Sequence, residues 1–383
     1  MRTIGVVTVA RSDYGIYRPV LQRIQEDSGL DLHLFVTGMH LSPEFGMTVQ
    51  AIEQDGFEIS DRVEMLLSSE TPEGIAKSMG LGTLGFAQAY ARSQLDILLV
   101  LGDRFEMHAA VVAALPFNIP VAHIHGGELT EGAIDDAIRH SITKMSHLHF
   151  VATETYAQRV IQMGEEPWRV VISGAPGLDN FREIQLLSRE ELGERYDVDL
   201  RDPFFLITYH PVTLEYEQTE NQIDALLAAL EETDATLVFT YPNADTGSRL
   251  IIDRVRDFVA RHRRAHFLIN LGTQGYFSMM SCAAAMIGNS SSGIIEAASF
   301  KLPVVNIGNR QKGRVRGKNV IDVGCSRKEI LAGISKATSS DFSKAISNLG
   351  NPYGDGQAAE RIVDKLKHVE LNKTLLVKRF HRM

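Results

Sequence analysis

Short apolar runs alternate with helix-length segments along most of this chain. In the first half, these runs occupy residues 4–9, 32–37, 97–101, 121–124, 149–152 and 169–172. In the second half, they occupy residues 204–208, 236–240, 266–269, 284–287 and 304–307. Continuous apolar runs joined by helices are typical of parallel strands that are buried on both faces. The pattern therefore predicts an α/β fold built on parallel sheets.

A change in composition separates the two sets of strands. Residues 174–203 become charged and helical, and a chain of 383 residues exceeds what a single core usually supports. We predict a Rossmann-like domain over residues 1–176, a second over 177–356, and a C-terminal helix and tail over 357–383 that packs on the first domain. Two doubly wound domains that face each other across a cleft form the GT-B architecture, and ligands bind at the carboxyl ends of such strands.

Ionisable residues follow two consecutive strands of the first domain. Asp103 and Arg104 follow residues 97–101, and His125 and Glu128 follow residues 121–124. A helical segment then carries Asp135, Asp136 and Arg139, so we expect these groups to converge on one crevice. Carboxylates and an imidazole suit proton transfer, and guanidinium groups suit an anion. Asp103 and Glu128 could instead cap helices, but Gly beside ionisable groups at both strand ends favours a site.

The first strand ends in a turn that contains Arg11, Asp13 and Gly15. The turn lacks the glycine spacing of the dinucleotide fingerprint, so we predict no nicotinamide or flavin cofactor. Arg11 could contact a phosphate or a base, or it could pair with Asp13 at the surface. The glycine-rich residues 68–85 indicate either a lid or a tightly packed helix.

The second domain offers an anion site. Residues 288–293 read GNSSSG between a strand and a helix that carries Glu296, so hydroxyl groups and backbone N–H groups would point at a bound anion. A single serine cap would not require Ser290, Ser291 and Ser292 together. A basic segment then begins at Arg310, directly after a strand, and we expect Arg310 to face the cleft.

Composition narrows the choice of partners. A formal net charge of −9 argues against nucleic acid, and no apolar stretch reaches the length of a membrane span. The two cysteines do not form a disulfide framework, and a strand-like run begins too early for a signal peptide. We therefore expect a cytoplasmic protein with a small-molecule partner.

The motifs together resemble the UDP-N-acetylglucosamine 2-epimerase family, in its hydrolysing branch from sialic-acid biosynthesis. The resemblance covers nearly the whole length. It is carried by RSDYG at 11–15, VTGMH at 36–40, GDRFE at 102–106, HIHGGE at 123–128, IRHSITKMSHLH at 138–149, HPVT at 210–213, NADTGS at 243–248, GNSSSGIIE at 288–296 and NIGNRQKGRVRG at 306–317.

This resemblance implies conversion of UDP-N-acetylglucosamine and water to N-acetylmannosamine and UDP, through elimination to a 2-acetamidoglucal and addition of water. It implies a homodimer or homotetramer, without a cofactor or a metal. The implied catalytic residues are Asp103, His125, Glu128, Asp136 and His210. The implied ligand-binding residues are Arg11, Asp13, Arg104, Arg139, His210, Asn243, Gly272, Ser290, Ser291, Ser292, Glu296 and Arg310.

One position departs from the family pattern. Many members have a glutamate where this chain has His125, so the second acid or base could be His125 or the nearby Glu128.

Four other functions stay open. The same reaction could act on a UDP- or GDP-linked 2,4-diacetamido-2,4,6-trideoxyhexose, as in legionaminic acid pathways. A GT-B glycosyltransferase would need an acceptor site, and a binding protein would lack turnover. A metal-dependent hydrolase is suggested by His123, His125, His140, His147 and His149.

Overall fold

The computed structural model describes residues 1–69, 71–130, 134–242, 248–269 and 271–382. They form two compact units, of which unit 1 contains Met1–Asn180 and Tyr353–Met383, and unit 2 contains Phe181–Pro352. The chain thus leaves unit 1 after Asn180 and returns at Tyr353, whereas the sequence pattern suggests limits at residues 176 and 356.

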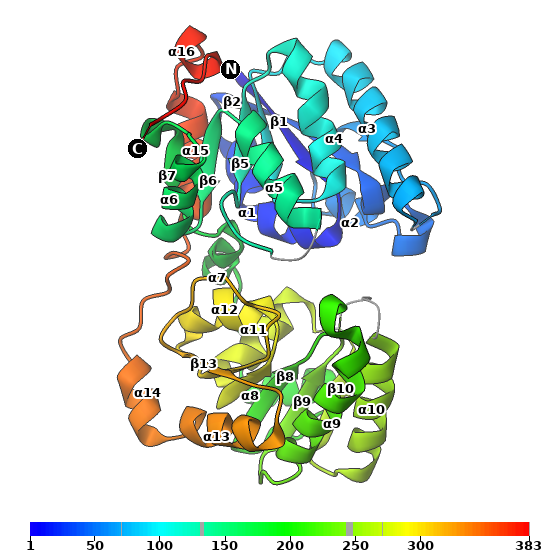
Figure 1. The fold of residues 1–383 in the computed structure, drawn as a ribbon, viewed down its shortest axis with the longest axis vertical. Helices are drawn as coiled ribbons and strands as arrows, with labels where there is room; N and C mark the ends of the chain where they lie inside the picture. Colours follow the sequence, from blue (N-terminus) through cyan, green and yellow to red (C-terminus); the bar gives the residue numbers. More distant parts are fainter. Residues whose placement is uncertain (70, 131–133, 243–247, 270, 383) are drawn as a thin grey trace. The chain divides into compact units, whose positions relative to one another are not determined.

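Unit 1 is built on a parallel sheet with the strand order β3-β2-β1-β4-β5-β6-β7 (Figure 1). Its strands are β1 (Arg2–Thr8), β2 (Leu30–Thr37), β3 (Ile59–Val63), β4 (Ile97–Leu101), β5 (Val121–Ile124), β6 (Leu148–Val151) and β7 (Val170–Ile172). Its helices are α1 (Arg11–Glu26), α2 (Val49–Gln54), α3 (Pro72–Arg92), α4 (Phe105–Ala114), α5 (Ile134–Met145), α6 (Glu154–Gln162), α15 (Ala358–His368) and α16 (Lys373–Leu376), and α7 (Asn180–Glu183) begins where unit 1 ends.

Unit 2 repeats this design with the strand order β10-β9-β8-β11-β12-β13. Its strands are β8 (Phe204–Thr208), β9 (Thr236–Thr240), β10 (Ala265–Leu268), β11 (Ala285–Gly288), β12 (Val304–Ile307) and β13 (Val320–Val323). Its helices are α8 (Arg189–Tyr196), α9 (Thr219–Leu230), α10 (Ser248–Arg261), α11 (Gly272–Cys282), α12 (Ser291–Ile295), α13 (Arg327–Ala337) and α14 (Ser340–Ile346).

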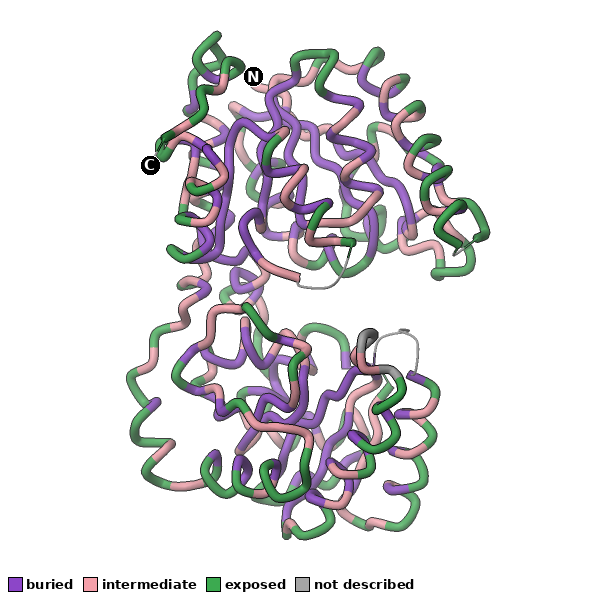
Figure 2. Tube along the Cα trace, in the orientation of Figure 1, coloured by how far each residue is buried: buried purple, intermediate pink, exposed green. Residues whose placement is uncertain are grey.

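Apolar layers cover both faces of each sheet. In β4, Ile97 and Leu99 pack in one cluster with α1 and α15, whereas Leu98 and Val100 pack in another with α3, α4 and α5. Figure 2 shows the central strands of both sheets as mainly buried segments. Burial on both faces explains the continuous apolar runs, and the predicted strands at residues 97–101, 121–124, 204–208, 236–240 and 304–307 are confirmed with these bounds.

Two edge strands escaped prediction because charged residues interrupt their apolar runs. The sequence of β3 is ISDRV and that of β13 is VIDV, and in both the burial alternates or is incomplete. An edge strand that meets solvent carries charged residues, so its sequence lacks a continuous apolar run.

Most of residues 68–85 form the first part of α3, and tight packing explains the glycines at Gly82 and Gly85. Helix α3 packs along α4, and a Cβ atom at Gly82 would lie 2.6 Å from Met65 Cε and 3.1 Å from Ala109 Cβ. The absence of a side chain therefore permits the close approach of α3 to its neighbours.

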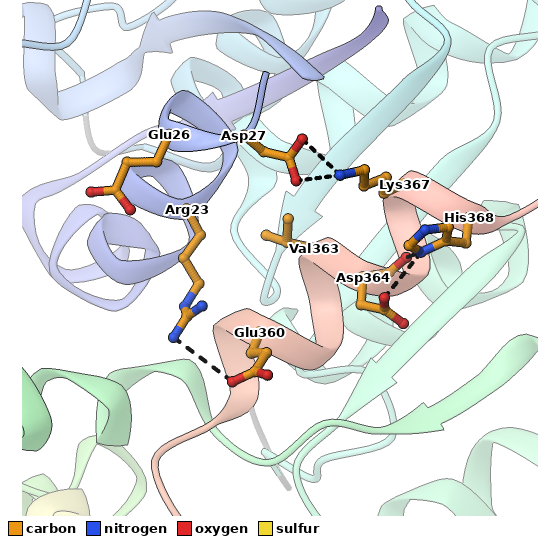
Figure 3. A pocket seen from close by; sticks show the side chains of 8 residues that line it. All are labelled: Arg23, Glu26, Asp27, Glu360, Val363, Asp364, Lys367 and His368. Carbon is orange, nitrogen blue, oxygen red and sulfur yellow. Dashed lines mark hydrogen bonds and ion pairs between the residues drawn. The ribbon is translucent and has the colours of Figure 1, made fainter. Parts of the chain in front are cut away.

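The C-terminal segment completes unit 1. Ala359, Ile362 and Leu366 of α15 are fully buried in the cluster that contains α1, and the red α15 lies within unit 1 in Figure 1. Ion pairs between Asp27 and Lys367 and between Arg23 and Glu360 border a charged groove of about 290 Å³ between these helices (Figure 3). The fully buried Arg169 also donates to the carbonyl oxygens of Leu375 and Thr374.

We expect Ile362→Ala to destabilise unit 1 by about 2–4 kcal/mol, because truncation leaves a cavity in a packed core. Urea unfolding followed by tryptophan fluorescence measures this change, since Trp168 is the single tryptophan and lies in unit 1. Val377→Ala is the control, because the Val377 side chain is 62% exposed. An unchanged midpoint in Ile362→Ala would show that the segment does not stabilise unit 1.

Candidate active site

The candidate site of unit 1 lies where β4 and β5 end. Leu101 pairs with Ile124 in the parallel register, and the Gly102 N–H donates to the Ile124 carbonyl at 3.0 Å. His125 then adopts a left-handed backbone conformation with φ of 65°. Asp103 and His125 therefore leave neighbouring strands at the same edge, as the sequence predicts.

Arg139 of α5 forms an ion pair with Asp103. The Arg139 side chain is only 6% exposed, whereas that of Asp103 is 22% exposed. Charge-assisted hydrogen bonds are strong and directional, so the buried guanidinium fixes a carboxylate that still meets solvent. Arg139 is thus positioned to orient Asp103.

The two consecutive aspartates of α5 have different surroundings. Burial raises the pKa of Asp135, and the charge of Asp103 raises it further. Asp136 instead accepts a hydrogen bond from the Thr130 N–H at 2.8 Å and lies 3.6 Å from His140 Nε2. The charge of Asp103 thus acts on Asp135, whereas Asp136 contacts the Thr130 backbone, and the catalytic role of Asp136 stays a prediction.

His125 and Glu128 are bonded to each other. His125 Nδ1 lies 2.7 Å from Glu128 Oε1, and the side chains are 12% and 5% exposed respectively. A carboxylate that accepts the Nδ1 proton leaves Nε2 with a lone pair, so it fixes one tautomer of the ring. The two residues between which the sequence could not choose form a single unit, in which the imidazole is the more accessible part.

Arg104 lies beside Asp103 but is directed to a different carboxylate. Its guanidinium donates to both oxygens of Glu106, at 3.0 and 3.2 Å, and contacts Met39 Sδ at 3.4 Å. Glu106 is fully buried, whereas the Arg104 side chain is 36% exposed. Arg104 can therefore present positive charge to a ligand while Glu106 holds it.

Asp13 has a structural task at the start of α1, and its contact with the ligand stays a prediction. Its buried carboxylate accepts hydrogen bonds from Val9 N–H, Ala10 N–H and Thr8 Oγ1 at the start of α1. Burial raises its pKa to about 6. Asp13 therefore shapes the turn before α1, and Arg11 is exposed at the first residue of that helix.

Two further histidines of unit 1, His123 and His149, are core groups. His123 Nε2 donates to the Gly102 carbonyl at 2.8 Å, and burial lowers the pKa of His123 to about 3. His149 is fully buried and lies 3.0 Å from Glu165. Within the described ranges, no three His, Cys, Asp or Glu side chains are grouped as a metal site requires.

Asn289 organises the site of unit 2. Its side chain accepts from the His210 N–H at 2.7 Å and donates to the His210 carbonyl at 2.8 Å, so it joins the ends of β8 and β11. A Cβ atom at Gly288 would lie 2.0 Å from the Thr208 carbonyl oxygen. Only glycine permits this approach, which brings the turn that contains Ser290, Ser291 and Ser292 to the end of β8.

Positive charge and hydroxyl groups gather beside Asn289. Arg310 and Gln311 donate to the Asn289 carbonyl at 3.3 and 2.8 Å. Burial, and then the charge of Arg310, lower the pKa of His210 to about 3, so this imidazole is neutral. His210 and Arg310, which the sequence predicts together, are neighbours in the structure.

Ser290 caps the five-residue α12, and its hydroxyl accepts from the Ser292 N–H at 3.3 Å. Burial raises the pKa of Tyr276 in α11, which sequence reasoning missed, and the side chains of Thr208, Ser292 and Ser290 lower it. Its position in a mainly apolar helix gave no signal. Ser291 lies at the start of α12, and Glu296 ends it.

Two further predicted ligand-binding residues of unit 2 are Gly272 and Asn243. Gly272 is exposed at the first residue of α11, with φ of 59°. Asn243 lies outside the described residues.

In the part of the chain that the structure describes, no helix is both long and apolar enough to span a bilayer.

Comparison with known proteins identifies relatives over the full length. The family model for UDP-N-acetylglucosamine 2-epimerase matches residues 22–367. A Legionella pneumophila "UDP-N,N'-diacetylbacillosamine 2-epimerase (hydrolyzing)" is 39% identical, with 99% of each chain covered. A Campylobacter jejuni "GDP/UDP-N,N'-diacetylbacillosamine 2-epimerase (hydrolyzing)" is 42% identical, with 84% of each covered. An Escherichia coli "Polysialic acid biosynthesis protein P7" is 39% identical, with 92% of this chain and 90% of the relative covered.

A solved structure supports the fold. The Neisseria meningitidis UDP-GlcNAc 2-epimerase bound to UDP-GlcNAc superposes with a TM-score of 0.82, at 18% identity, over 96% of this chain and 99% of that one. The predicted fold class, an α/β protein of the GT-B type with two Rossmann-like domains, is confirmed.

Acidification should destabilise unit 1 because its buried histidines stay neutral. Burial lowers the pKa of His40 and His147 to about 4 and that of His123 to about 3. Below about pH 6.5 these histidines bind protons in the unfolded chain but stay neutral in the folded protein. Each therefore lowers the free energy of unfolding by about 2 kcal/mol between pH 7 and 5. Asp13 has a raised pKa and binds its proton in the folded protein over this range, so it adds about 1.4 kcal/mol to the free energy of unfolding. The net decrease in the free energy of unfolding is roughly 4 kcal/mol.

Urea unfolding at the two pH values, followed by Trp168 fluorescence, checks this loss. His147→Gln should reduce the pH dependence of the free energy of unfolding, because glutamine does not titrate. The variant should stay folded, since the amide oxygen can still accept from the Val121 N–H. His368→Gln is the control, since His368 is exposed. Equal stability of the wild-type protein at both pH values would contradict the prediction.

Proposed function

This chain belongs to the UDP-N-acetylglucosamine 2-epimerase family and is an enzyme of the hydrolysing 2-epimerase type, and from that premise we propose its substrate and the roles of its residues. The proposed substrate is a UDP-linked 2,4-diacetamido-2,4,6-trideoxyhexose of the N,N'-diacetylbacillosamine type. The products are UDP and the free sugar epimerised at C2. Two relatives named for this sugar support the choice, since they match this chain at 39% and 42% identity.

UDP-N-acetylglucosamine is the second candidate, with N-acetylmannosamine as its product. The family model carries the name of that substrate, and one relative is named for polysialic acid biosynthesis. Both candidates share a 2-acetamido group and a diphosphate leaving group, so the same proton chemistry serves either sugar.

The observation that carries the proposal is the presence of two oriented acid or base groups at one sheet edge. Asp103 is held by Arg139, and His125 is held by Glu128. Inversion at C2 through elimination needs one group that removes the C2 proton and another that delivers a proton to the opposite face. A carboxylate and an imidazole from neighbouring strands suit these two roles.

The proposed reaction has two steps. In the elimination, a base takes the C2 proton, a C1–C2 double bond forms, and the C1–O bond to UDP breaks. In the addition, a water oxygen bonds to C1, C2 gains a proton from the opposite face, and the second water proton returns to the enzyme. Asp103 and His125 Nε2 accept and donate these protons. Burial and the electrostatic field of Asp103 both raise the pKa of Asp135.

The residues of unit 2 have a complementary proposed role. Arg310 supplies positive charge, the neutral His210 supplies a hydrogen-bonding ring, and Ser290 and Ser291 supply hydroxyl and backbone donors. Donors of this kind stabilise the negative charge that develops on the departing diphosphate. We further propose that Glu296 and Asn243 contact the nucleoside, as the family resemblance implies.

Proton NMR in deuterated buffer tests the substrate and the route together. We expect the wild-type enzyme to convert the UDP-linked diacetamido sugar to UDP and a free sugar deuterated at C2, because the proton exchanges with solvent during elimination. Asp103→Asn should lose turnover by at least about 100-fold and still bind UDP. Absence of deuterium at C2 would exclude the elimination, and absence of turnover on both candidate sugars would contradict the proposed function.

Glu128→Gln should lower kcat by about 100-fold with little change in KM, because the amide does not select the tautomer that leaves Nε2 as a base. Steady-state kinetics on the preferred sugar measures this effect, and UDP titration shows whether binding survives. His125→Ala should respond to added imidazole, whereas Glu128→Gln should not. A variant with wild-type kcat would show that Glu128 does not position His125.

A further inference from the structure

Unit 1 contains a cavity of about 660 Å³ that the proposed proton chemistry does not use. Its walls come from four segments, which are the short 3-10 helices Gly38–Leu41 and Pro43–Phe45 after β2, residues 64–69 after β3, the first turn of α3, and the start of α4. This volume lies in the usual range of small-molecule sites.

The lining is mainly apolar although the cavity is open. Three methionines, Met39, Met47 and Met65, line it together with Phe45 and Leu67. Phe45 and Leu67 are 41% and 40% exposed. Apolar side chains that surround an open concavity indicate a surface that a ligand covers, and flexible thioethers adapt to irregular shapes.

The cavity adjoins the proposed acid and base groups. Arg104 and Glu106 form part of its wall, and the Arg104 guanidinium contacts Met39 Sδ at 3.4 Å. Arg104 directly follows Asp103 and acts electrostatically on Asp135. A hexose with its C2 atom at Asp103 therefore has the cavity within reach of the opposite side of its ring.

We infer that this cavity is the subsite for the C4 acetamido and C6 methyl groups of the sugar, an inference that rests on the proposed function. A diacetamido trideoxyhexose carries a methyl group at C6 and a second methyl in its C4 acetamide. UDP-N-acetylglucosamine carries hydroxyl groups at both positions. Methyl groups that pack on methionine and phenylalanine give up no hydrogen bonds. Hydroxyl groups placed there give up their hydrogen bonds to water.

The same wall offers partners for the amide of the C4 substituent. Ser42 and Ser68 line the cavity, and their hydroxyl groups can donate to a carbonyl or accept from an N–H. The subsite thus combines apolar contact for two methyl groups with polar contact for one amide. The segments that line the subsite therefore select the sugar.

The test compares kcat/KM for the UDP-linked diacetamido sugar and for UDP-N-acetylglucosamine. The wild-type enzyme should prefer the diacetamido sugar. Phe45→Ser and Leu67→Ser should each reduce this preference by about tenfold, which is the usual effect of one methyl contact on specificity. Both residues are substantially exposed, so neither substitution should disturb the core. Leu84→Ser is the matched control, because Leu84 is 66% exposed on α3 and does not line the cavity.

Each outcome separates the subsite from the reaction. If both variants keep the wild-type preference while the product still carries deuterium at C2, the subsite is wrong and the proposed reaction stands. A wild-type preference for UDP-N-acetylglucosamine overturns the subsite in the same way. If the wild-type enzyme converts neither sugar, the proposed function fails and the subsite fails with it. Trp168 fluorescence on urea unfolding confirms that Phe45→Ser and Leu67→Ser remain folded, and a loss of preference in Leu84→Ser as large as theirs also overturns the subsite.

Discussion

The central strands of both units are buried on each face, and this burial restricts where polar groups can lie. A buried strand excludes charges until it ends, and the carboxyl ends of parallel strands meet at one edge. In unit 1 this brings Asp103 and His125 out of neighbouring strands, since Leu101 pairs with Ile124. In unit 2 the same constraint brings the turn at Gly288 to the end of β8. The candidate chemistry follows from strand order and burial rather than from any single loop.

Three candidate groups of unit 1 that reach solvent are each held by a less exposed partner of opposite or complementary charge. Asp103 and Arg139 are 22% and 6% exposed, and His125 and Glu128 are 12% and 5% exposed. Arg104 and Glu106 follow the same rule, at 36% and 0%. A buried charge is stable only when it is paired, so the partner gains its stability from the pair and fixes the exposed group in return. Precise orientation of the exposed groups is what proton transfer requires.

The proposed reaction and the proposed selection of the sugar depend on different segments of unit 1. The proposed proton groups follow β4 and β5, whereas the apolar cavity is lined mainly by the segments after β2 and β3. Substitutions in those segments can alter the sugar without moving Asp103 or His125. This division is consistent with relatives of similar identity that carry names for different products, such as a diacetylbacillosamine epimerase and a polysialic acid biosynthesis protein.

The sequence alone determined the two sets of central strands, the polar groups at their ends and the family resemblance, because burial on both faces leaves a continuous apolar run that ends where polar residues begin. It missed β3 and β13, whose edge positions permit charged residues. Only the tertiary structure assigned partners, joining Glu128 to His125, bonding Asp136 to the Thr130 backbone, and placing Asp13 at the start of α1. Partners in an ion pair or a cavity wall are chosen by packing between distant segments, and linear spacing carries no record of that packing.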